Sequence, residues 1–272
     1  NTAGPILFLE CDKVTLDAAE VGVGWCQQLP PYLGEPKGSI EVIQTENLLA
    51  SFLGLERSVG LGWLNKPSAV LAGSNKITQL HLAGRLGLPL PETLVSNRPE
   101  DIRAFVEAAK PAEVVVKNLA TPWVTVKGQT LASYTKRVSP EWLERDMELS
   151  FCPAIYQVFH PRRLDYRVVV VGDKHFSARS RNIAGQEEDI RLTVATGDNF
   201  DRCEFPPDLL AKLKVLLSDL GLNYCAADFI EDADGELYFL EINTCGAWWW
   251  LDELYDGEIT RTLTRFLIEA NQ

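Results

Sequence analysis

The stretch that decides the fold prediction is residues 227–246, ADFIEDADGELYFLEINTCG. Asp234 and Gly235 stand between two short apolar runs, and Asp-Gly is among the strongest short signals for a β-hairpin with a two-residue type I′ turn. With that turn, Asp228 lies directly opposite Glu241, and Asn243 points to the same face two residues further on. Opposed Cβ atoms are ~5 Å apart, so two carboxylates there repel each other unless they are protonated or bridged by a cation.

This face has two interpretations. Carboxylate and amide oxygens suit Mg²⁺, which typically takes one or two carboxylates and completes its shell with substrate phosphates. Alternatively, the face is the solvent-exposed side of a hairpin, where acids are ordinary. We expect Ile230 and Phe239 to share the face with Asp228, and these apolar neighbours favour a metal site.

The composition is that of a globular chain with room for two or three lobes. The 272 residues are 46% hydrophobic and 24% charged, which is ordinary for a folded protein of this length. Apolar runs such as residues 168–171 are far shorter than the ~20 residues of a membrane helix, and no signal segment is visible. We therefore expect a cytoplasmic protein with no membrane partner.

The cysteines and the net charge narrow the range of partners. The six cysteines show no C-x-x-C spacing, which predicts reduced thiols rather than a zinc site or a disulfide framework. The formal net charge of −12 argues against nucleic acid, because neutralising phosphates needs a basic face. A cationic peptide or a metal-bound ligand would be attracted instead, although solubility alone also explains the charge.

The order of the expected elements predicts an α+β fold with mostly antiparallel sheets. Ser74 or Asn75 caps a helix that Gly87 ends, and residues 172–173, Gly-Asp, mark the turn of a second hairpin. No G-x-G-x-x-G follows a strand, so we expect no doubly wound dinucleotide domain. The expected helices cover residues 41–58, 75–86, 97–109, 206–220 and 258–270. The expected strands lie in residues 92–95, 113–117, 154–160, 165–181 and 227–243, and residues 118–130 are expected to form a polar loop.

Residues 228–246 resemble the C-terminal metal motif of the ATP-grasp superfamily, and the resemblance covers most of residues 66–272. SNK…LHLAGRLGLPLPETLVSN (74–97) is similar to the helix and strand that open the family's central lobe, and VVVK (114–117) to its phosphate-binding strand. YQVFHPRRLDYRVVVVGDK (156–174) is similar to the hinge and following hairpin of ribosomal-protein glutamate ligases. The aromatic run CGAWWWLDELY (245–255) resembles that of the microviridin-type macrocycle ligases, the graspetide peptide-maturation enzymes.

The resemblance implies an ATP-grasp fold, in which central and C-terminal lobes clamp ATP. It implies a short or incomplete N-terminal lobe at residues 1–72, a central lobe at 73–155 and a C-terminal lobe with the metal site at 156–272. The sequence departs from the glutamate ligases in residues 192–200, LTVATGDNF, where their pattern of asparagine, histidine and glycines is missing. The loop 118–130 has only Gly128. Microviridin-type ligases show similar losses, which favours the peptide-modifying branch.

The resemblance assigns roles around the phosphates of the nucleotide. It implies that Asp228, Glu241 and Asn243 hold two Mg²⁺ ions across the phosphates of ATP. Lys76 and Lys117 would contact those phosphates as point charges. Taken alone, Lys76 would be an ordinary solvated lysine in the first turn of a helix, where the macrodipole disfavours a cation.

The hinge is expected to bind the nucleoside. Gln157, Val158 and Phe159 match the hinge residues that face the adenine edge, and an ordinary core strand is the alternative. Asp165 matches the acid that binds the ribose hydroxyls.

Arginines are expected at the transferring phosphoryl group. Arg167 resembles the arginine that steadies this group in the family. Arg179 and Arg181 alternate onto one face of the returning strand, so that one of them joins Arg167 or both lie on a charged solvent face. Arg191, in EEDIR (187–191), matches a further family arginine.

The implied activity is that of an ATP-dependent carboxylate ligase that works through an acyl phosphate. The expected substrate is a ribosomal precursor peptide, in which Asp or Glu side chains are joined to Lys amines or to Ser and Thr hydroxyls. A leader segment would dock beside the 168–181 hairpin and the acidic run 187–189, and related enzymes suggest a homodimer. The alternatives are a ligase for a small amino acid or peptide, and a nucleotide-binding protein without turnover.

Overall fold

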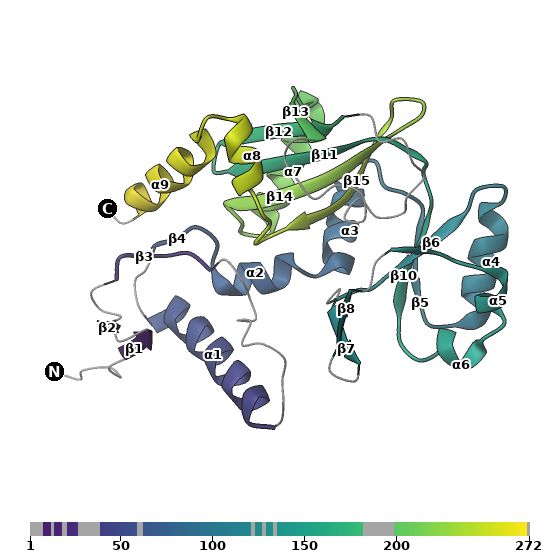
Figure 1. Cartoon of the computed structure of the whole chain (residues 1–272), viewed down its shortest axis with the longest axis horizontal. Coiled ribbons are helices and arrows are strands. Elements are labelled where there is room, and N and C mark those ends of the chain that lie inside the picture. The colour runs from purple at the N-terminus through teal and green to yellow at the C-terminus, as the bar shows by residue number, and fades with distance from the viewer. Residues whose placement is uncertain are drawn as a thin grey trace.

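The computed structural model describes residues 8–11, 14–17, 21–26, 39–58, 62–120, 123–126, 129–132, 135–181 and 199–270. Within these residues the strands form two larger antiparallel sheets that lie side by side in Figure 1. The C-terminal sheet has the order β13-β12-β11-β14-β15, and the central sheet has the order β5-β10-β6-β9. The predicted α+β organisation with antiparallel sheets is confirmed.

The elements before the central sheet are short strands and helices of unequal length. They are β1 (Phe8–Cys11), β2 (Val14–Asp17), β3 (Val23–Gly24), α1 (Ser39–Ser58), β4 (Gly62–Trp63), α2 (Pro67–Gly73) and α3 (Lys76–Arg85). The central part then consists of β5 (Thr93–Ser96), α4 (Pro99–Ala109), β6 (Val114–Lys117), β7 (Trp123–Val126), β8 (Gln129–Ala132), β9 (Lys136–Arg137), α5 (Pro140–Leu143), α6 (Asp146–Leu149) and β10 (Ala154–Val158).

The last part of the chain builds the C-terminal sheet and the helices on its two faces. Its elements are β11 (Arg162–Val171), β12 (Lys174–Ser180), β13 (Phe200–Arg202), α7 (Pro207–Asp219), β14 (Tyr224–Asp232), β15 (Leu237–Asn243), α8 (Trp249–Leu254) and α9 (Glu258–Ala270). Val168 and Val170 pack with α7 and α3 on one face, whereas Val169 and Val171 pack with α8 and α9 on the other. Because both faces are covered, the run at 168–171 is apolar without alternation.

Local signals fixed the ends of the helices as expected. The side chain of Asn75 accepts a hydrogen bond from the Thr78 N–H at 3.1 Å, so Asn75 is the cap of α3. Gly87 follows α3 at φ +71, and Gly221 follows α7 at φ +67, the left-handed conformation that glycine adopts without a steric cost.

The prediction of a polar loop at residues 118–130 is wrong in part. β7 and β8 form an antiparallel hairpin there, in which Trp123 pairs with Ala132. The strands WVTV and QTLA contain β-branched and aromatic residues that favour extended backbone, and the polar residues around them obscured this signal.

The decisive hairpin pairs Asp228 with Glu241 as predicted, but its turn and the pairs between the turn and Phe229 differ from the prediction. Asp232 N–H donates to Glu236 O at 3.0 Å, so the loop is the three residues 233–235, and Gly235 takes φ +87. Three-residue loops of this kind require a left-handed residue at their end. A bulge between Asp228 and Phe229 then shifts the register back by one residue, and Asp228 pairs with Glu241 as predicted.

The same bulge corrects the prediction for Phe239. Leu240 is the extra residue on β15, so the alternation of side chains reverses there. Phe239 is fully buried on the α7 face, where its ring lies 5.4 Å from that of Phe229. It does not share the face of Asp228.

The packing also bears on the lobes expected at 1–72, 73–155 and 156–272. α3 packs against α7 and β15 of the C-terminal sheet, and β10 belongs wholly to the central sheet. We therefore propose that the central lobe runs from about β5 to β10, and that α2 and α3 belong with the C-terminal sheet.

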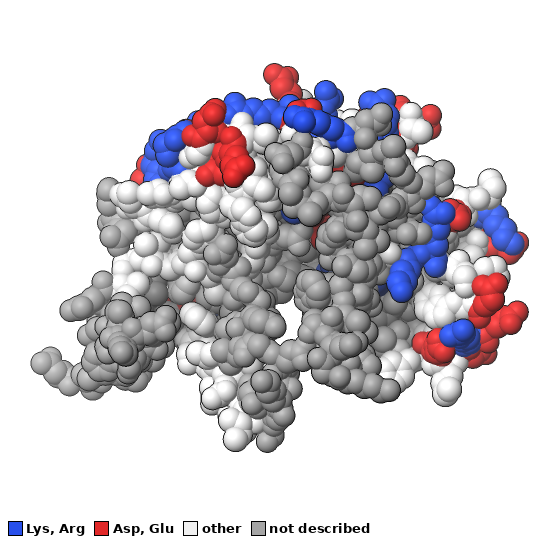
Figure 2. Space-filling model, viewed as in Figure 1, with Lys and Arg blue, Asp and Glu red and all other residues white. Residues whose placement is uncertain are grey.

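The surface in Figure 2 carries both signs of charge. Lys, Arg, Asp and Glu gather along the upper edge and around the central lobe, and blue and red are interspersed in both places. Among the described residues, no helix is long and apolar enough to cross a membrane.

Candidate functional site

A row of charged residues crosses three neighbouring strands of the C-terminal sheet. In the strand register, Arg167 on β11 pairs with Asp228 on β14, and Asp228 pairs with Glu241 on β15. Arg167 Nη1 lies 3.1 Å from Asp228 Oδ1. Since side chains at paired positions point to one face, the row is fixed by the register.

Asn243 completes the row and joins its two acids. Its Nδ2 donates to Asp228 Oδ2 at 2.9 Å and to Glu241 Oε1 at 3.3 Å. The predicted sharing of one face by Asp228, Glu241 and Asn243 is therefore what the structure has. Two acids this close are held together by donors from the amide and from basic neighbours.

Lys76 approaches the row from the first residue of α3. Its Nζ lies 3.1 Å from Glu241 Oε2, and the two side chains are 27% and 31% exposed. The ion pair offsets the unfavourable position of a cation at a helix N-terminus.

The charge of a second lysine, Lys117 of the central sheet, also acts on Glu241. Burial raises the pKa of Glu241, but the charges of Lys76 and Lys117 and hydrogen bonds from Lys76 and Asn243 outweigh it, so the net pKa is lowered. Lys117 is the last residue of β6. Of the two predicted phosphate lysines, Lys76 is thus in contact with Glu241, and the charge of Lys117 acts on the same carboxylate.

Two buried amide side chains support this site and were missed from the sequence. Asn65 Oδ1 accepts from the N–H groups of Asn223 and Tyr224, and its Nδ2 donates to Tyr224 O and Thr244 O. Asn65 thereby ties the start of β14 to the residue after β15, and no pattern in the sequence marks it. Gln79 bonds the main chain of β15, and its spacing of three residues from Lys76, on the same side of α3, was a usable signal.

The hinge residues are tightly held by the central sheet. Gln157 is buried, and its Nε2 donates to Thr93 Oγ1 at 2.9 Å. Val158 N–H donates to Glu92 O at 3.0 Å, and Phe159 N–H donates to Glu113 O at 2.7 Å. The main-chain N–H groups of Val158 and Phe159 are therefore both used within the central part of the chain.

Asp165 shares the site face with Arg167, two residues along β11. Its carboxylate is buried and lies 3.2 Å from Arg162 Nη1. Asp165 N–H donates to Ser180 Oγ at 2.8 Å.

The structure does not bring Arg179 or Arg181 to Arg167. Arg167 pairs with Ala178, so exposed Arg179 lies on the opposite face, next to Tyr166. Arg181 is exposed and its Nη2 lies 2.8 Å from Asp201 Oδ1. The geometry favours the charged solvent face for both. Arg191 and the acidic run 187–189 lie outside the described residues.

Aromatic side chains pack beside the end of β15. Trp25 stacks on Trp248 at 6.4 Å and meets Tyr224 edge-on at 6.2 Å, and Trp250 lies 4.7 Å from Phe200. These contacts belong to the core on the α8 and α9 face.

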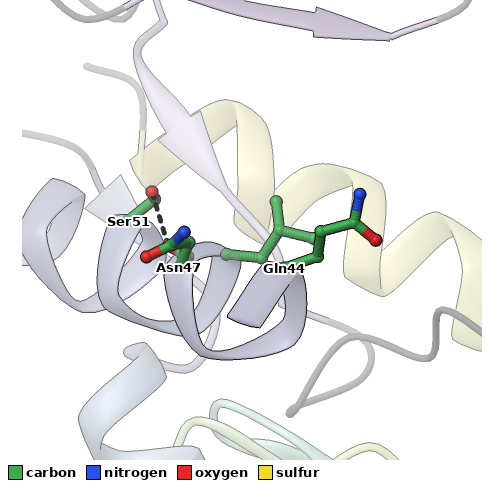
Figure 3. Close-up of a pocket in the computed structure, with 4 residues that line it drawn as sticks. Gln44, Asn47 and Ser51 are labelled. Atoms are coloured by element: carbon green, nitrogen blue, oxygen red, sulfur yellow. Dashed lines mark hydrogen bonds between the residues drawn. The ribbon is translucent and has the colours of Figure 1, made fainter. Parts of the chain in front are cut away.

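The described residues contain a pocket of about 420 Å³ on α1, away from this site. Figure 3 shows Gln44, Asn47 and Ser51 at its lining, with Ser51 Oγ donating to Asn47 O at 2.8 Å. None of the charged residues of the row contributes to it.

The donor set of the row fits magnesium better than a transition metal. Among the described residues, no cluster of three or more His, Cys, Asp or Glu is placed to hold a metal. Two carboxylates and one amide are instead the hard oxygen donors that Mg²⁺ uses when phosphates supply further ligands.

The chain resembles known proteins in sequence and in structure. No protein-family model matches it. It is 25% identical over 215 residues to a "Probable alpha-L-glutamate ligase" of Saccharophagus degradans, covering 78% of this chain and 69% of that protein. It is 27% identical over 188 residues to "Probable alpha-L-glutamate ligase 1" of Shewanella amazonensis, covering 68% of this chain and 60% of that protein.

Solved structures resemble it over nearly its whole length. The macrocyclase MdnC bound with precursor peptide MdnA, from Microcystis aeruginosa, has TM-score 0.81 and 26% identity over 97% of this chain and 83% of its own. The macrocyclase MdnB of the same organism has TM-score 0.76 and 28% identity over 98% and 84%. A RiPP-associated ATP-grasp ligase of Chryseobacterium gregarium, in complex with ADP and a leader and core peptide, shares the fold with TM-score 0.83 and 23% identity over 97% and 84%.

Proposed function

We propose that this chain, an ATP-dependent ligase with the ATP-grasp fold, links side chains within a ribosomal precursor peptide. The observation that carries the proposal is the row of Arg167, Asp228 and Glu241, with Lys76 paired to Glu241 and the charge of Lys117 helping to lower the pKa of Glu241. Such an array of acids and cations is suited to a nucleotide triphosphate with its metal, because it offers ligands for the cation and counter-charges for the phosphates.

Each residue of the row has a proposed task. Asp228, Glu241 and Asn243 would hold two Mg²⁺ ions, which supply charge neutralisation on the phosphates. Lys76 and Lys117 would bind phosphate oxygens as point charges. Both lysines are at the ends of regular elements, so the backbone of α3 and β6 orients them.

Arg167 would bind the transferring phosphoryl group. Its guanidinium is held beside Asp228, at 3.1 Å, on a strand whose next residues, 168–171, pack on both faces of the sheet. A preorganised cation at this position stabilises the charge that spreads over the equatorial oxygens during transfer.

The nucleoside would lie along the hinge. Val158 and Phe159 would lie beside the adenine, with their N–H groups bonded to Glu92 O and Glu113 O. Asp165 would bind the ribose hydroxyls through its carboxylate, which also forms an ion pair with Arg162. Gln157 would act indirectly, by holding β10 against Thr93.

The chemistry needs no protein nucleophile. A carboxylate oxygen of the peptide attacks the γ-phosphorus and ADP leaves, which gives an acyl phosphate. An amine or hydroxyl of the peptide then attacks the acyl carbon, the C–O bond to phosphate breaks, and an amide or ester forms as the proton is released. The site residues thus position the reacting groups and neutralise the charge of the phosphates, which is the usual way in which phosphoryl transfer is catalysed.

The peptide substrate is proposed from the solved relatives. MdnC was solved with its precursor peptide and the Chryseobacterium ligase with a leader and core peptide. We propose the same class here: Asp or Glu side chains joined to Lys, Ser or Thr, a leader docked beside β11 and β12, and a cytoplasmic homodimer. The likeness to glutamate ligases keeps a small amino-acid acceptor as the second candidate.

The test is peptide-dependent turnover. The purified chain is incubated with ATP, Mg²⁺ and precursor peptides encoded beside its gene, and ADP and peptide mass are followed. We expect ADP only with peptide, and the loss of one water mass per linkage. Turnover with free glutamate and no change in any peptide would favour the second candidate, and nucleotide binding without any ADP would contradict the ligase.

A further inference from the structure

Gln79 makes a set of hydrogen bonds that no other residue of α3 makes with the sheet. It is 2% exposed, its Nε2 donates to Ile242 O at 2.9 Å, and its Oε1 accepts from Ile242 N–H at 2.9 Å. The same Nε2 donates to Gly73 O at 2.6 Å, at the end of α2. One amide therefore joins α2, α3 and β15.

Ile242 is the residue between two of the proposed metal ligands. It points into the α7 core, so Glu241 and Asn243 on either side of it point to the site. Among the described strands β15 is at the edge of the C-terminal sheet. The amide of Gln79 thus supplies at Ile242 the pair of bonds that a further strand would supply.

The position of these two hydrogen bonds between Gln79 and Ile242, here called the clamp, matters because of the neighbouring bulge. Leu240 is the extra residue of β15 immediately before Glu241. A bulge breaks the ladder locally, and a slip of one residue turns every following side chain to the other face. Holding Ile242 from the edge fixes the register after the bulge, where the two ligands lie.

The clamp also connects two parts of the site. Lys76 and Gln79 are three residues apart and reach the same edge of β15, Lys76 to the side chain of Glu241 and Gln79 to the main chain of Ile242. We propose that Gln79 is a positioning residue that holds Glu241 and Asn243 in register with Asp228 and fixes Lys76 beside them. The inference rests on the proposed function, because it concerns the metal and phosphate site named there.

The experiment compares Gln79→Met with Ile102→Val, a matched control. Met has nearly the shape of Gln but bonds neither Ile242 nor Gly73. Ile102 is fully buried in the core of the central sheet, so its variant loses stability without touching β15. Amide hydrogen exchange at Ile242 and the affinity for Mn²⁺ with a non-hydrolysable ATP analogue are measured on the full chain.

We expect faster exchange at Ile242 in Gln79→Met and about tenfold weaker Mn²⁺ binding, the low end of the loss seen when groups that support metal ligands are removed. Ile102→Val should keep both values even where it lowers the melting temperature as much. Gln79→Glu keeps an acceptor for Ile242 N–H and loses both donors, so intermediate exchange is expected, and it stands in if the Met variant does not fold.

Unchanged Ile242 exchange, or unchanged Mn²⁺ affinity despite faster exchange, would overturn the positioning role. If the unmodified chain binds no Mn²⁺ with the analogue, the proposed function fails, and the Ile242 exchange alone then decides whether Gln79 holds the strand.

Discussion

Lys76 Nζ lies 3.1 Å from Glu241 Oε2, and this pair joins the first turn of α3 to the edge of the C-terminal sheet. Gln79 lies three residues along the chain from Lys76, and its side chain bonds the main chain of β15, the strand that carries Glu241. The residues proposed to bind metal and those proposed to bind phosphate are therefore both held by the contact between α3 and β15. Their contributions to binding and turnover can be separated only by matched variants.

Glu241→Gln tests the carboxylate itself. The amide keeps the shape of Glu241 but removes the charge that would bind the cation, so we expect turnover to fall by about a hundredfold or more, as for other lost electrostatic groups. Mn²⁺ binding with a non-hydrolysable analogue checks the cause. Glu236→Gln, exposed on the same hairpin, is the control and should leave binding unchanged; equal losses in both variants would contradict the assignment.

The pH dependence of stability gives a second view of Glu241. Its pKa in the folded chain is below the ordinary value of 4.5, so the ionised form stabilises the fold. This contribution is fully present above the unfolded pKa and is lost as pH falls through the folded pKa. Melting temperatures from pH 6 downward (roughly pH 6 to 3) should therefore fall more steeply in the unmodified chain than in Glu241→Gln. Parallel curves would show that the ion pair with Lys76 adds nothing.

Arg167→Met tests the proposed phosphoryl contact. We expect kcat to fall by about a hundredfold with a smaller change in KM for ATP, because a transition-state contact is lost. Arg167→Lys should recover part of the rate, since it restores the charge without the planar fork. Arg179→Met lies one strand away but on the opposite face, and rates close to the unmodified chain are expected; a loss equal to that of Arg167→Met would refute the division between the faces.

Asn65→Ala tests the support at the other end of the site. The change leaves buried main-chain groups of Tyr224 and Thr244 without their partner, so we expect a loss of about 3 kcal/mol in the free energy of unfolding. Denaturant unfolding measures it. Asn97→Ala removes a single exposed bond to Ser150 O and should cost much less.

The hairpin explains how far the sequence could lead. Asp-Gly and the alternation predicted the pairing of Asp228 with Glu241, yet the turn is one residue longer and a bulge at Leu240 compensates. Neither departure has a marked local pattern, so the two errors cancelled at the acids and remained visible at Phe239. Tertiary packing against Phe229 decides that side chain.

Other parts of the site differ in what the sequence could supply. The turn at Gly172 predicts Arg167 opposite Ala178, so the place of Arg179 on the other face was accessible by counting. Gln79 was accessible from its spacing to Lys76. Asn65 was not, because its four hydrogen bonds go to Asn223, Tyr224 and Thr244, which lie more than a hundred residues away, and only the folded chain brings them together.

The central claim is that a peptide carboxylate is phosphorylated by ATP before it is joined. The most direct measurement uses precursor peptide whose Asp and Glu carboxylates carry heavy oxygen, with mass analysis of the phosphate released. The account predicts one heavy oxygen in phosphate for each linkage formed. Linkages formed with only light oxygen in the phosphate would contradict it.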